Sequence, residues 1–174
     1  MSKAPFEVLV IATHNRKKAG EMITILSRRF PDLELKTLVD FDEAPEPEET
    51  GSDYPSNAGI KSESAADFTG EWCLADDAGL EIDFLDGAPG LYSKRFGGED
   101  LPFPDKIKMI LELIKDAPPD SRGARFRCCV ALTPPYRMGP TITFMAVCEG
   151  RIAEQPSGAP VNTSSKRPMP RLVP

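Results

Sequence analysis

Residues 72–80, WCLADDAGL, place two adjacent aspartates, Asp76 and Asp77, directly after a short apolar run. Such a run is typical of a buried strand. Two carboxylates at the end of a buried strand cost free energy unless a cation or hydrogen-bond donors compensate them. Mg²⁺ is a suitable cation because it takes oxygen ligands and often only one or two carboxylates. Asp and Gly are also favoured turn formers, so the stretch is compatible with a hairpin between strands at 72–75 and 80–85.

The patterns around this stretch predict a chain that mixes strands and helices. Apolar or alternating runs predict further strands at residues 6–12, 33–38, 124–132 and 141–148. Apolar residues at helical spacing predict helices at residues 16–29, 57–67 and 107–115. An acidic loop at 42–49 and a glycine-rich loop at 87–98 lie between these elements. The mixture predicts an α/β fold with a substantial sheet.

The composition limits the classes of protein to which the chain can belong. Its 174 residues fit one domain with a sizeable core, and its net charge of −6 argues against a nucleic-acid or membrane-surface binder. The four cysteines form no CxxC pair and His14 is the only histidine, so a zinc site is poorly supplied. No long apolar run and no signal-peptide pattern are present, so we expect a cytoplasmic protein with reduced thiols.

A candidate anion site follows the first predicted strand. Residues 13–18, THNRKK, open the helix at 16–29, and the N–H groups and dipole of a helix start favour anions. Thr13 and Asn15 offer short hydrogen-bonding side chains, and Lys18 can reach a phosphate from one turn into the helix. The stretch lacks the glycines and the GKS/T pattern of a Walker A loop. An ordinary N-cap followed by a solvated basic turn also fits this pattern.

Two further stretches carry candidate ligands. Glu49, beside a Thr-Gly turn, could approach the aspartates as another oxygen ligand, and Lys61 could face them from a predicted helix. In the glycine-rich loop, Arg95 could bind phosphate. The alternatives are that Glu49 lies in a solvated acidic loop, that Lys61 is an exposed helical lysine, and that the glycine-rich loop has only a structural role. Taken together, the carboxylates, the helix start and the cations describe a metal–polyphosphate site, because phosphoryl chemistry requires mainly charge neutralisation and in-line positioning.

Five motifs in this order resemble those of the inosine/xanthosine triphosphate pyrophosphatase family: Thr13-x-Asn15-x-x-Lys18; Glu49-Thr50-Gly51 with Asn57-Ala58-x-x-Lys61; Leu74-Ala75-Asp76-Asp77-x-Gly79-Leu80; Gly87-Ala88-Pro89-Gly90-x-Tyr92-Ser93; and Arg125-Phe126. The resemblance implies Mg²⁺-dependent hydrolysis of ITP, dITP and XTP to the monophosphate and pyrophosphate, which keeps these purine nucleotides out of DNA and RNA. It also implies an elongated mixed sheet flanked by helices, two lobes with a central cleft, and a homodimer.

The resemblance also assigns roles by position. It places triphosphate binding on Thr13, Asn15, Lys18 and Lys61, Mg²⁺ binding on Glu49 and Asp76, and general-base catalysis on Asp77. These roles agree with the chemistry of the residues, because attack of water on the α-phosphorus needs a base, a metal that neutralises the phosphates and a pyrophosphate leaving group. Arg95 is a further candidate for phosphate binding.

The C-terminal part of the chain departs from the family pattern. The predicted pyrophosphatase domain spans residues 1–158, after which family members continue with an FGYDP segment, a helix and a late Ser-His-Arg that recognise the purine base. Residues 159–174 contain no Phe, Tyr, Asp or His, and their composition predicts an irregular, truncated or frame-shifted tail. Because a site without hydrogen-bonding groups for the base loses discrimination, we expect weak or unselective activity.

Three alternatives to the pyrophosphatase share some of these sequence features. A weak or inactive isoform that binds nucleotide or a full-length partner is compatible with the tail. The Maf-like group of related fold hydrolyses other nucleotides, but the order of the motifs favours the pyrophosphatase family. A phosphoacceptor receiver domain also has paired acids, but there they follow the first strand, where this chain has residues 13–18.

Overall fold

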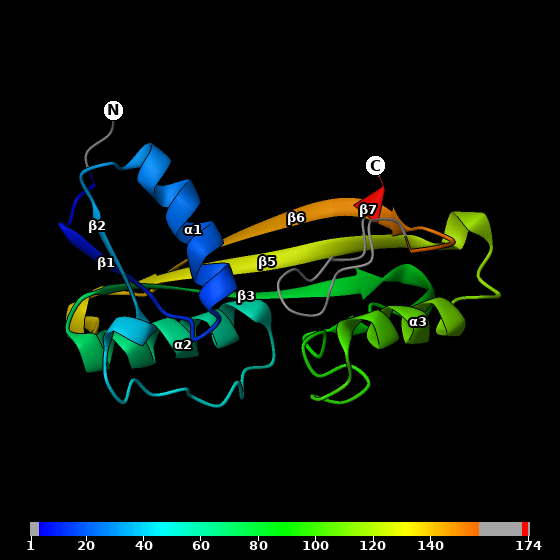
Figure 1. Cartoon of the computed structure of the whole chain (residues 1–174), viewed down its shortest axis with the longest axis horizontal. Coiled ribbons are helices and arrows are strands. Elements are labelled where there is room, and N and C mark those ends of the chain that lie inside the picture. Colours follow the sequence, from blue (N-terminus) through cyan, green and yellow to red (C-terminus); the bar gives the residue numbers. More distant parts are fainter. Residues whose placement is uncertain (1–3, 157–171, 174) are drawn as a thin grey trace. The chain divides into compact units, whose positions relative to one another are not determined.

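Three α-helices and seven strands form the described part of the chain, residues 4–156 and 172–173, in this computed structural model (Figure 1). The helices are α1 (Arg16–Arg29), α2 (Tyr54–Thr69) and α3 (Phe103–Leu113). The strands are β1 (Val8–Ile11), β2 (Glu34–Thr37), β3 (Trp72–Ile82), β4 (Pro89–Gly90), β5 (Gly123–Thr133), β6 (Ile142–Ile152) and β7 (Leu172–Val173). Most of these elements lie where the sequence predicts them, although α2 begins at Tyr54 rather than at residue 57.

The strands form one sheet in the order β2-β1-β3-β5-β6-β7, and β4 pairs with β3 outside this path. β1 pairs in parallel with both β2 and β3, and α1 provides the crossover from β1 to β2 that parallel neighbours require. β3 with β4 and β6 with β7 are antiparallel. The predicted α/β class with a mixed sheet and flanking helices is therefore confirmed.

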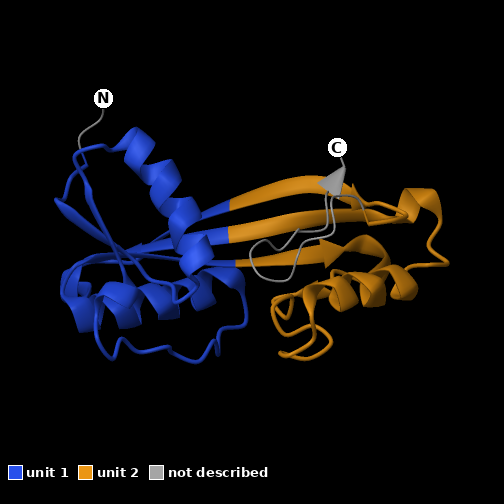
Figure 2. Cartoon of the chain, in the orientation of Figure 1, with its two compact units in different colours: residues 1–77, 129–145 blue, residues 78–128, 146–174 orange. Residues whose placement is uncertain are grey.

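The chain divides into two compact units (Figure 2). Unit 1 comprises residues 1–77 and 129–145, and unit 2 comprises residues 78–128 and 146–174. Unit 1 contains α1, α2, β1 and β2, whereas unit 2 contains α3 and β4. Seven of the eight predicted site residues fall in unit 1, and Arg95 falls in unit 2.

The two aspartates lie inside a strand rather than in a turn. β3 is continuous, so the predicted hairpin between strands at 72–75 and 80–85 is wrong. The buried apolar residues of β3 stand at odd positions up to Ala75 and at even positions from Leu80 onward, so its alternation shifts by one residue between them. The sequence predicts a turn because Asp and Gly are favoured turn formers. The strand continues here because each carboxylate has a lysine partner.

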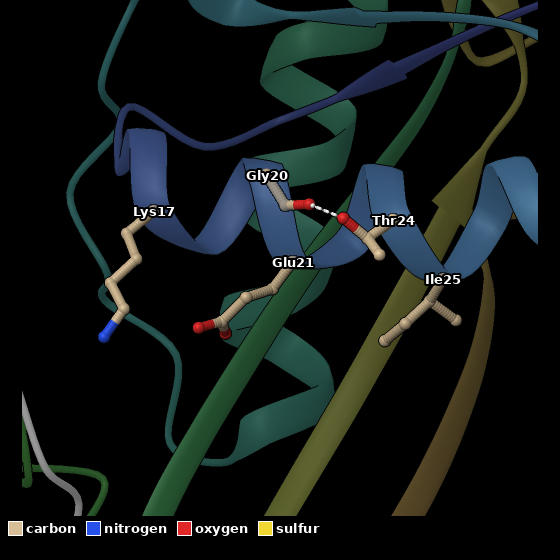
Figure 3. Close-up of a pocket in the computed structure, with 5 residues that line it drawn as sticks. All are labelled: Lys17, Gly20, Glu21, Thr24 and Ile25. Carbon is tan, nitrogen blue, oxygen red and sulfur yellow. Dashed lines mark hydrogen bonds between the residues drawn. The ribbon is translucent and has the colours of Figure 1, made fainter. Parts of the chain in front are cut away.

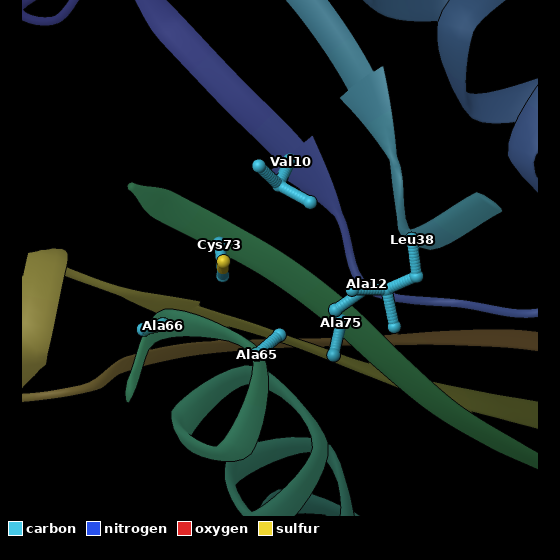
Figure 4. Close-up of a cluster of buried hydrophobic side chains, with 7 residues drawn as sticks. All are labelled: Val10, Ala12, Leu38, Ala65, Ala66, Cys73 and Ala75. Carbon is cyan, nitrogen blue, oxygen red and sulfur yellow. The ribbon is translucent and has the colours of Figure 1, made fainter. Parts of the chain in front are cut away.

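Small side chains form the core of unit 1, where α2 packs against β1 and β3 (Figure 4). Ala65 and Ala66 of α2 lie in one buried cluster with Cys73 and Ala75 of β3. Side chains of this size allow a helix backbone to come close to the sheet. Further members of the cluster are Val10 of β1, Ala12 directly after β1, and Leu38 directly after β2.

Helix α2 is defined at both ends by its local sequence. Asp53 is the N-cap, and its side chain accepts a hydrogen bond from the backbone N–H of Ser56 at 2.8 Å. Gly70 ends the helix in the left-handed conformation with a φ of 68°, which glycine adopts without steric cost. These two ends fix the register of the residues that α2 presents to β3.

Unit 2 has a core of its own between α3 and the strands of that unit. It is built from larger side chains than the core of unit 1: Leu80, Ile82, Ile110, Ile114, Ala117, Ala124 and Ile152. The buried guanidinium of Arg122 donates hydrogen bonds to the backbone carbonyls of Ile114, Ile152 and Ala153 at 3.0–3.1 Å. These bonds satisfy a charge that would otherwise be costly to bury.

Most of the predicted irregular tail, residues 159–174, lies outside the described residues. Within that segment the structure describes only β7, which pairs with Arg151 and Ile152 of β6 and was not predicted. Among the described residues, no helix has both the length and the apolar character needed to cross a membrane.

A ladder of hydroxyl groups fastens α2 to the end of β5. The Thr133 hydroxyl lies 2.7 Å from the hydroxyl of Ser62 and 3.1 Å from that of Thr141, which donates to Glu63 at 2.8 Å. Ser62 and Thr133 are fully buried, so neither hydroxyl can exchange its partner for bulk water.

We expect Thr133→Val to lower the free energy of unfolding by about 1–3 kcal/mol, because buried hydroxyls then lose a partner while side-chain volume is kept. Urea unfolding measures this loss. Thr24→Val, at an exposed position of α1, is the matched control and should change stability by less than about 0.5 kcal/mol. Equal, small losses in both variants would show that the ladder contributes nothing.

Candidate active site

Two carboxylates converge on one lysine in unit 1. The Nζ atom of Lys61 lies 3.0 Å from Oε1 of Glu49 and 3.2 Å from Oδ1 of Asp77. The three side chains come from a loop, from α2 and from β3, which are separate elements of the chain. The predicted approach of Glu49 and Lys61 to the aspartate pair is therefore present for Asp77.

Asn57 connects the loop that carries Glu49 to the strand that carries Asp77. Its side-chain oxygen accepts a hydrogen bond from the backbone N–H of Gly51 at 2.8 Å, and its Nδ2 donates to Oδ2 of Asp77 at 3.4 Å. Asn57 is buried and lies one helical turn before Lys61. Asn57 belongs to one of the five family motifs, but the sequence predicts no role for it. Its spacing of four residues from Lys61 is the signal that places both side chains on one face of α2.

Gly51 is required for this arrangement. A Cβ atom at this position would lie 2.6 Å from Oδ1 of Asn57 and 2.7 Å from Cβ of Ser56, closer than real contacts allow. The loop can therefore approach the start of α2 only with glycine here. The Thr-Gly pair after Glu49 thus marks a close approach of backbone to helix.

The electrostatic environment perturbs both partners of the Lys61–Asp77 pair. Burial raises the pKa of the Asp77 carboxyl above its ordinary value, outweighing the ammonium of Lys61, which lowers it. Burial also acts on Lys61 and lowers its pKa, but the charges of Asp77 and Glu49 raise it, and the net pKa lies above the usual value. A carboxyl group with a raised pKa is better suited to act as a general base, because the pKa of an efficient base lies near the working pH.

Asp76 lies on the other side of the strand. Adjacent residues in a strand point to opposite faces, and Asp76 forms an ion pair with Lys18 of α1 at 2.5 Å. Figure 1 shows α1 and α2 on opposite sides of β1 and β3, in agreement with the separate partners of the two aspartates. The contacts therefore group Glu49 with Asp77, whereas Asp76, predicted as the second metal ligand beside Glu49, is grouped with Lys18.

The predicted helix-start anion site has the N-cap geometry expected of it. Asn15 is the N-cap of α1, and its Oδ1 accepts hydrogen bonds from the backbone N–H groups of Lys17 and Lys18 at 3.1 and 3.2 Å. The Thr13 hydroxyl accepts a hydrogen bond from the backbone N–H of Asn15 at 3.2 Å. His14 is exposed and its Nε2 lies 3.4 Å from the carbonyl of Pro45. These contacts establish the cap, while phosphate binding at this end stays a prediction.

Arg95 belongs to unit 2, and its guanidinium lies over the ring of Tyr92, 5.8 Å from the ring centroid. Both side chains are exposed. The loop that carries them is held by Ser93, whose hydroxyl accepts a hydrogen bond from the N–H of Leu80 at 2.9 Å and donates to the carbonyl of Gly90 at 2.6 Å. The phosphate-binding role of Arg95 stays a prediction.

The carboxylate pair suits a hard divalent cation, although the described residues bring no group of three or more His, Cys, Asp or Glu together as a metal site. Glu49 and Asp77 already direct one oxygen each at a single cation, the ammonium of Lys61. Mg²⁺ is commonly bound through one or two carboxylates with substrate phosphates and water as the remaining ligands. Two carboxylates are therefore a sufficient protein contribution to such a site.

A pocket also lies on the surface of α1 (Figure 3). Its lining residues come from one side of that helix: Lys17, Gly20, Glu21, Thr24 and Ile25. It contains neither of the predicted aspartates nor Lys61. Because catalysis needs converging polar groups, the carboxylate cluster is a better candidate for the active site than this groove.

Comparison with known proteins identifies the family of the chain. Residues 9–161 match the Ham1 family. The chain belongs to the Ham1 family. A dITP/XTP pyrophosphatase from Exiguobacterium sibiricum is 45% identical over 150 residues, which cover 86% of this chain and 74% of that protein. Another from Geobacillus kaustophilus is 40% identical over 150 residues, covering 86% of this chain and 72% of that protein.

Solved structures of Ham1 proteins have the same fold. A HAM1 protein from Coxiella burnetii superposes with a TM-score of 0.78 at 35% identity, covering 88% of this chain and 76% of that one. A nucleoside-triphosphatase, or dITP/XTP pyrophosphatase, from Mycobacterium abscessus gives a TM-score of 0.72 at 32% identity, covering 87% and 77%. The resemblance to the inosine/xanthosine triphosphate pyrophosphatases is confirmed at the level of the Ham1 family.

Lys61→Met tests the electrostatic role of Lys61. Without the ammonium, the folded-state pKa of Asp77 rises further above the unfolded value of about 3.9. A raised carboxyl pKa leaves stability intact below the unfolded value and lowers it as the pH rises. We therefore expect little loss at about pH 4 and a loss of about 2 kcal/mol at pH 7 in urea unfolding.

The control for this experiment is Lys108→Met, which removes an exposed lysine paired with Asp105. Its effect should stay below about 0.5 kcal/mol across the same pH range. A loss in Lys61→Met that is equal at both pH values would show that the side chain acts through packing alone.

Proposed function

We propose that this chain hydrolyses non-standard purine nucleoside triphosphates (ITP, dITP and XTP) to the monophosphate and pyrophosphate, with Mg²⁺ as cofactor. The observation that carries this proposal is the convergence of Glu49 and Asp77 on Lys61 in a Ham1 chain. Relatives of the chain are named dITP/XTP pyrophosphatases, which supports the choice of substrate.

Asp77 is the proposed general base. Its carboxylate takes a proton from the attacking water as the water oxygen bonds to the α-phosphorus and the bond from that phosphorus to the bridging oxygen breaks, releasing pyrophosphate. The raised pKa of Asp77 makes it a stronger proton acceptor than an ordinary carboxylate. Asn57 and Lys61 hold the carboxylate oriented through contacts to its two oxygens.

Glu49 and Asp76 would hold the metal, as their positions in the family motifs indicate, because Asp77 acts as the base and its carboxylate contacts the Lys61 ammonium. Bound Mg²⁺ supplies neutralisation of the phosphate charge. Asp76 also forms an ion pair with Lys18, so that ammonium lies beside one of the proposed metal ligands. Lys18 and Lys61 then act as point charges toward the triphosphate, together with Thr13, Asn15 and Arg95 as further phosphate-binding candidates.

Three wider aspects belong to this proposal. Hydrolysis of these triphosphates removes them from the pool used to make DNA and RNA. The proposed location is the cytoplasm, where nucleotides and reduced thiols coexist, and the four cysteines are all free thiols in the described structure. The proposed functional assembly is a homodimer.

Pyrophosphate release from ITP in the presence of Mg²⁺ tests the assignment of Asp77. Asp77→Asn keeps the size of the side chain but cannot accept the proton, so we expect a fall in kcat of about 100-fold or more. Asp100→Asn, at an exposed loop position, is the matched control and should retain the activity of the unmodified chain.

The same experiment separates the enzyme from the alternative of an inactive chain that binds nucleotide or a full-length partner. Absence of pyrophosphate release from both the unmodified chain and the control, with ITP binding still present in calorimetry, would replace the proposal by that alternative. Equal activity of Asp77→Asn and Asp100→Asn would remove Asp77 from the mechanism.

We expect the 174-residue chain to discriminate poorly between ITP and ATP. Residues 159–174 contain none of the Phe, Tyr, Asp or His side chains that the resemblance associates with recognition of the base. Loss of such hydrogen bonds removes most of a site's power to reject the wrong substrate. The ratio of kcat/KM for ITP and ATP should lie within about tenfold. A ratio of about 1,000 or more would show that other residues read the base.

A further inference from the structure

Each of the two proposed metal ligands is paired with a lysine of the chain itself. The Nζ atom of Lys61 lies 3.0 Å from Oε1 of Glu49. The Nζ atom of Lys18 lies 2.5 Å from Oδ2 of Asp76. The two lysines belong to different helices, Lys61 to α2 and Lys18 to α1. In both pairs the ammonium group takes the position at the carboxylate that another cation would need.

A lysine and a divalent cation therefore compete for the same carboxylate. Two positive charges about 4 Å apart repel each other strongly where little water screens them. Both pairs are largely shielded from solvent, since the exposed fraction of the side chain is 7% for Asp76, 21% for Glu49 and 19% for Lys61. Mg²⁺ also gives up its hydration water reluctantly. The ion pairs should therefore keep the affinity of the chain for Mg²⁺ alone low.

The lysines gain a second set of partners when a triphosphate binds. Lys18 lies in the first turn of α1, after the N-cap Asn15, where the N–H groups and the helix dipole favour anions. Its side chain has an exposed fraction of 40%, so it can turn from Asp76 to a phosphate without movement of the helix. Lys61 has three N–H donors, so it can exchange one partner and keep another.

We propose that Lys18 and Lys61 exchange carboxylate partners for phosphate oxygens when the nucleotide binds. Lys18 leaves Asp76, and Lys61 leaves Glu49 while it keeps its contact with Asp77. The two proposed metal ligands thereby become available at the moment when the phosphates bring further negative charge. Nucleotide and Mg²⁺ then bind with positive coupling, because each makes the site more favourable for the other. This inference rests on the proposed function, which supplies the triphosphate and the metal.

Calorimetric titration of the full chain measures the two affinities that the exchange links. One titrant is MgCl₂ alone, and the other is the Mg²⁺ complex of an inosine triphosphate analogue with a methylene group between the α- and β-phosphorus, which cannot be cleaved there. We expect opposite effects of Lys61→Met. The affinity for Mg²⁺ alone should rise by about tenfold or more because a repelling charge is removed. The affinity for the complex should fall by about tenfold or more because a phosphate partner is lost.

Lys18→Met should show the same opposite effects, and it decides the question if Lys61→Met does not fold. Lys108→Met, which removes an exposed lysine paired with Asp105, is the matched control and should change neither affinity by more than about twofold. Urea unfolding gives a readout that needs no nucleotide. About 10 mM Mg²⁺ should raise the unfolding midpoint of Lys61→Met more than that of the unmodified chain, because an ion that binds the folded state stabilises it.

The outcomes separate this inference from the proposed hydrolysis. A fall of both affinities would show that the lysines only maintain the site, and an unchanged affinity for Mg²⁺ alone would show that they do not compete with the metal. Any result other than the opposite pair in a folded variant overturns the exchange at that lysine. Pyrophosphate release without the opposite pair would leave the proposed function in place, whereas the opposite pair without pyrophosphate release would support the exchange and remove the hydrolysis.

Discussion

The buried negative charge of Asp77 is the constraint on which the candidate active site depends. A carboxylate in the interior of a sheet requires a cation, and Lys61 provides it at 3.2 Å. Lys61 can serve because α2 lies against β3 on a layer of alanines, which brings the helix close to the strand. Lys61 also pairs with Glu49, so the buried charge in β3 is linked through this lysine to both α2 and the loop that carries Glu49.

Helix α2 carries most of the side chains that compensate the buried charge of Asp77. Within about two turns it carries the amide that fastens the loop, the ammonium that pairs with both carboxylates and the hydroxyl that joins the helix to β5. Its capped ends prevent the helix from shifting along the strand. The side chains that contact Asp77 are therefore positioned by the same packing that stabilises unit 1.

The sequence predicts a large part of this arrangement, and its failures have definite causes. Helix α1 was predictable to the residue because Asn15 is a strong N-cap and the apolar residues after it keep helical spacing. The proposed break in β3 was wrong because turn propensity was weighed without the lysines, which are distant in sequence and compensate Asp76 and Asp77. The ion pairs of Asp77 with Lys61 and of Asp76 with Lys18 depend on which face of the strand each side chain occupies, and metal binding by Glu49 and Asp76 stays a prediction. That assignment requires knowing that the segment is a strand.

Lys61 also makes the folded chain independent of the ion that its chemistry is proposed to use. In many metal sites the clustered carboxylates repel one another when no metal is bound, so folding is coupled to metal binding. Here an internal counter-ion, Lys61, already offsets one of the two negative charges of the cluster. A shortage of divalent ions would therefore reduce turnover while leaving the protein folded and ready.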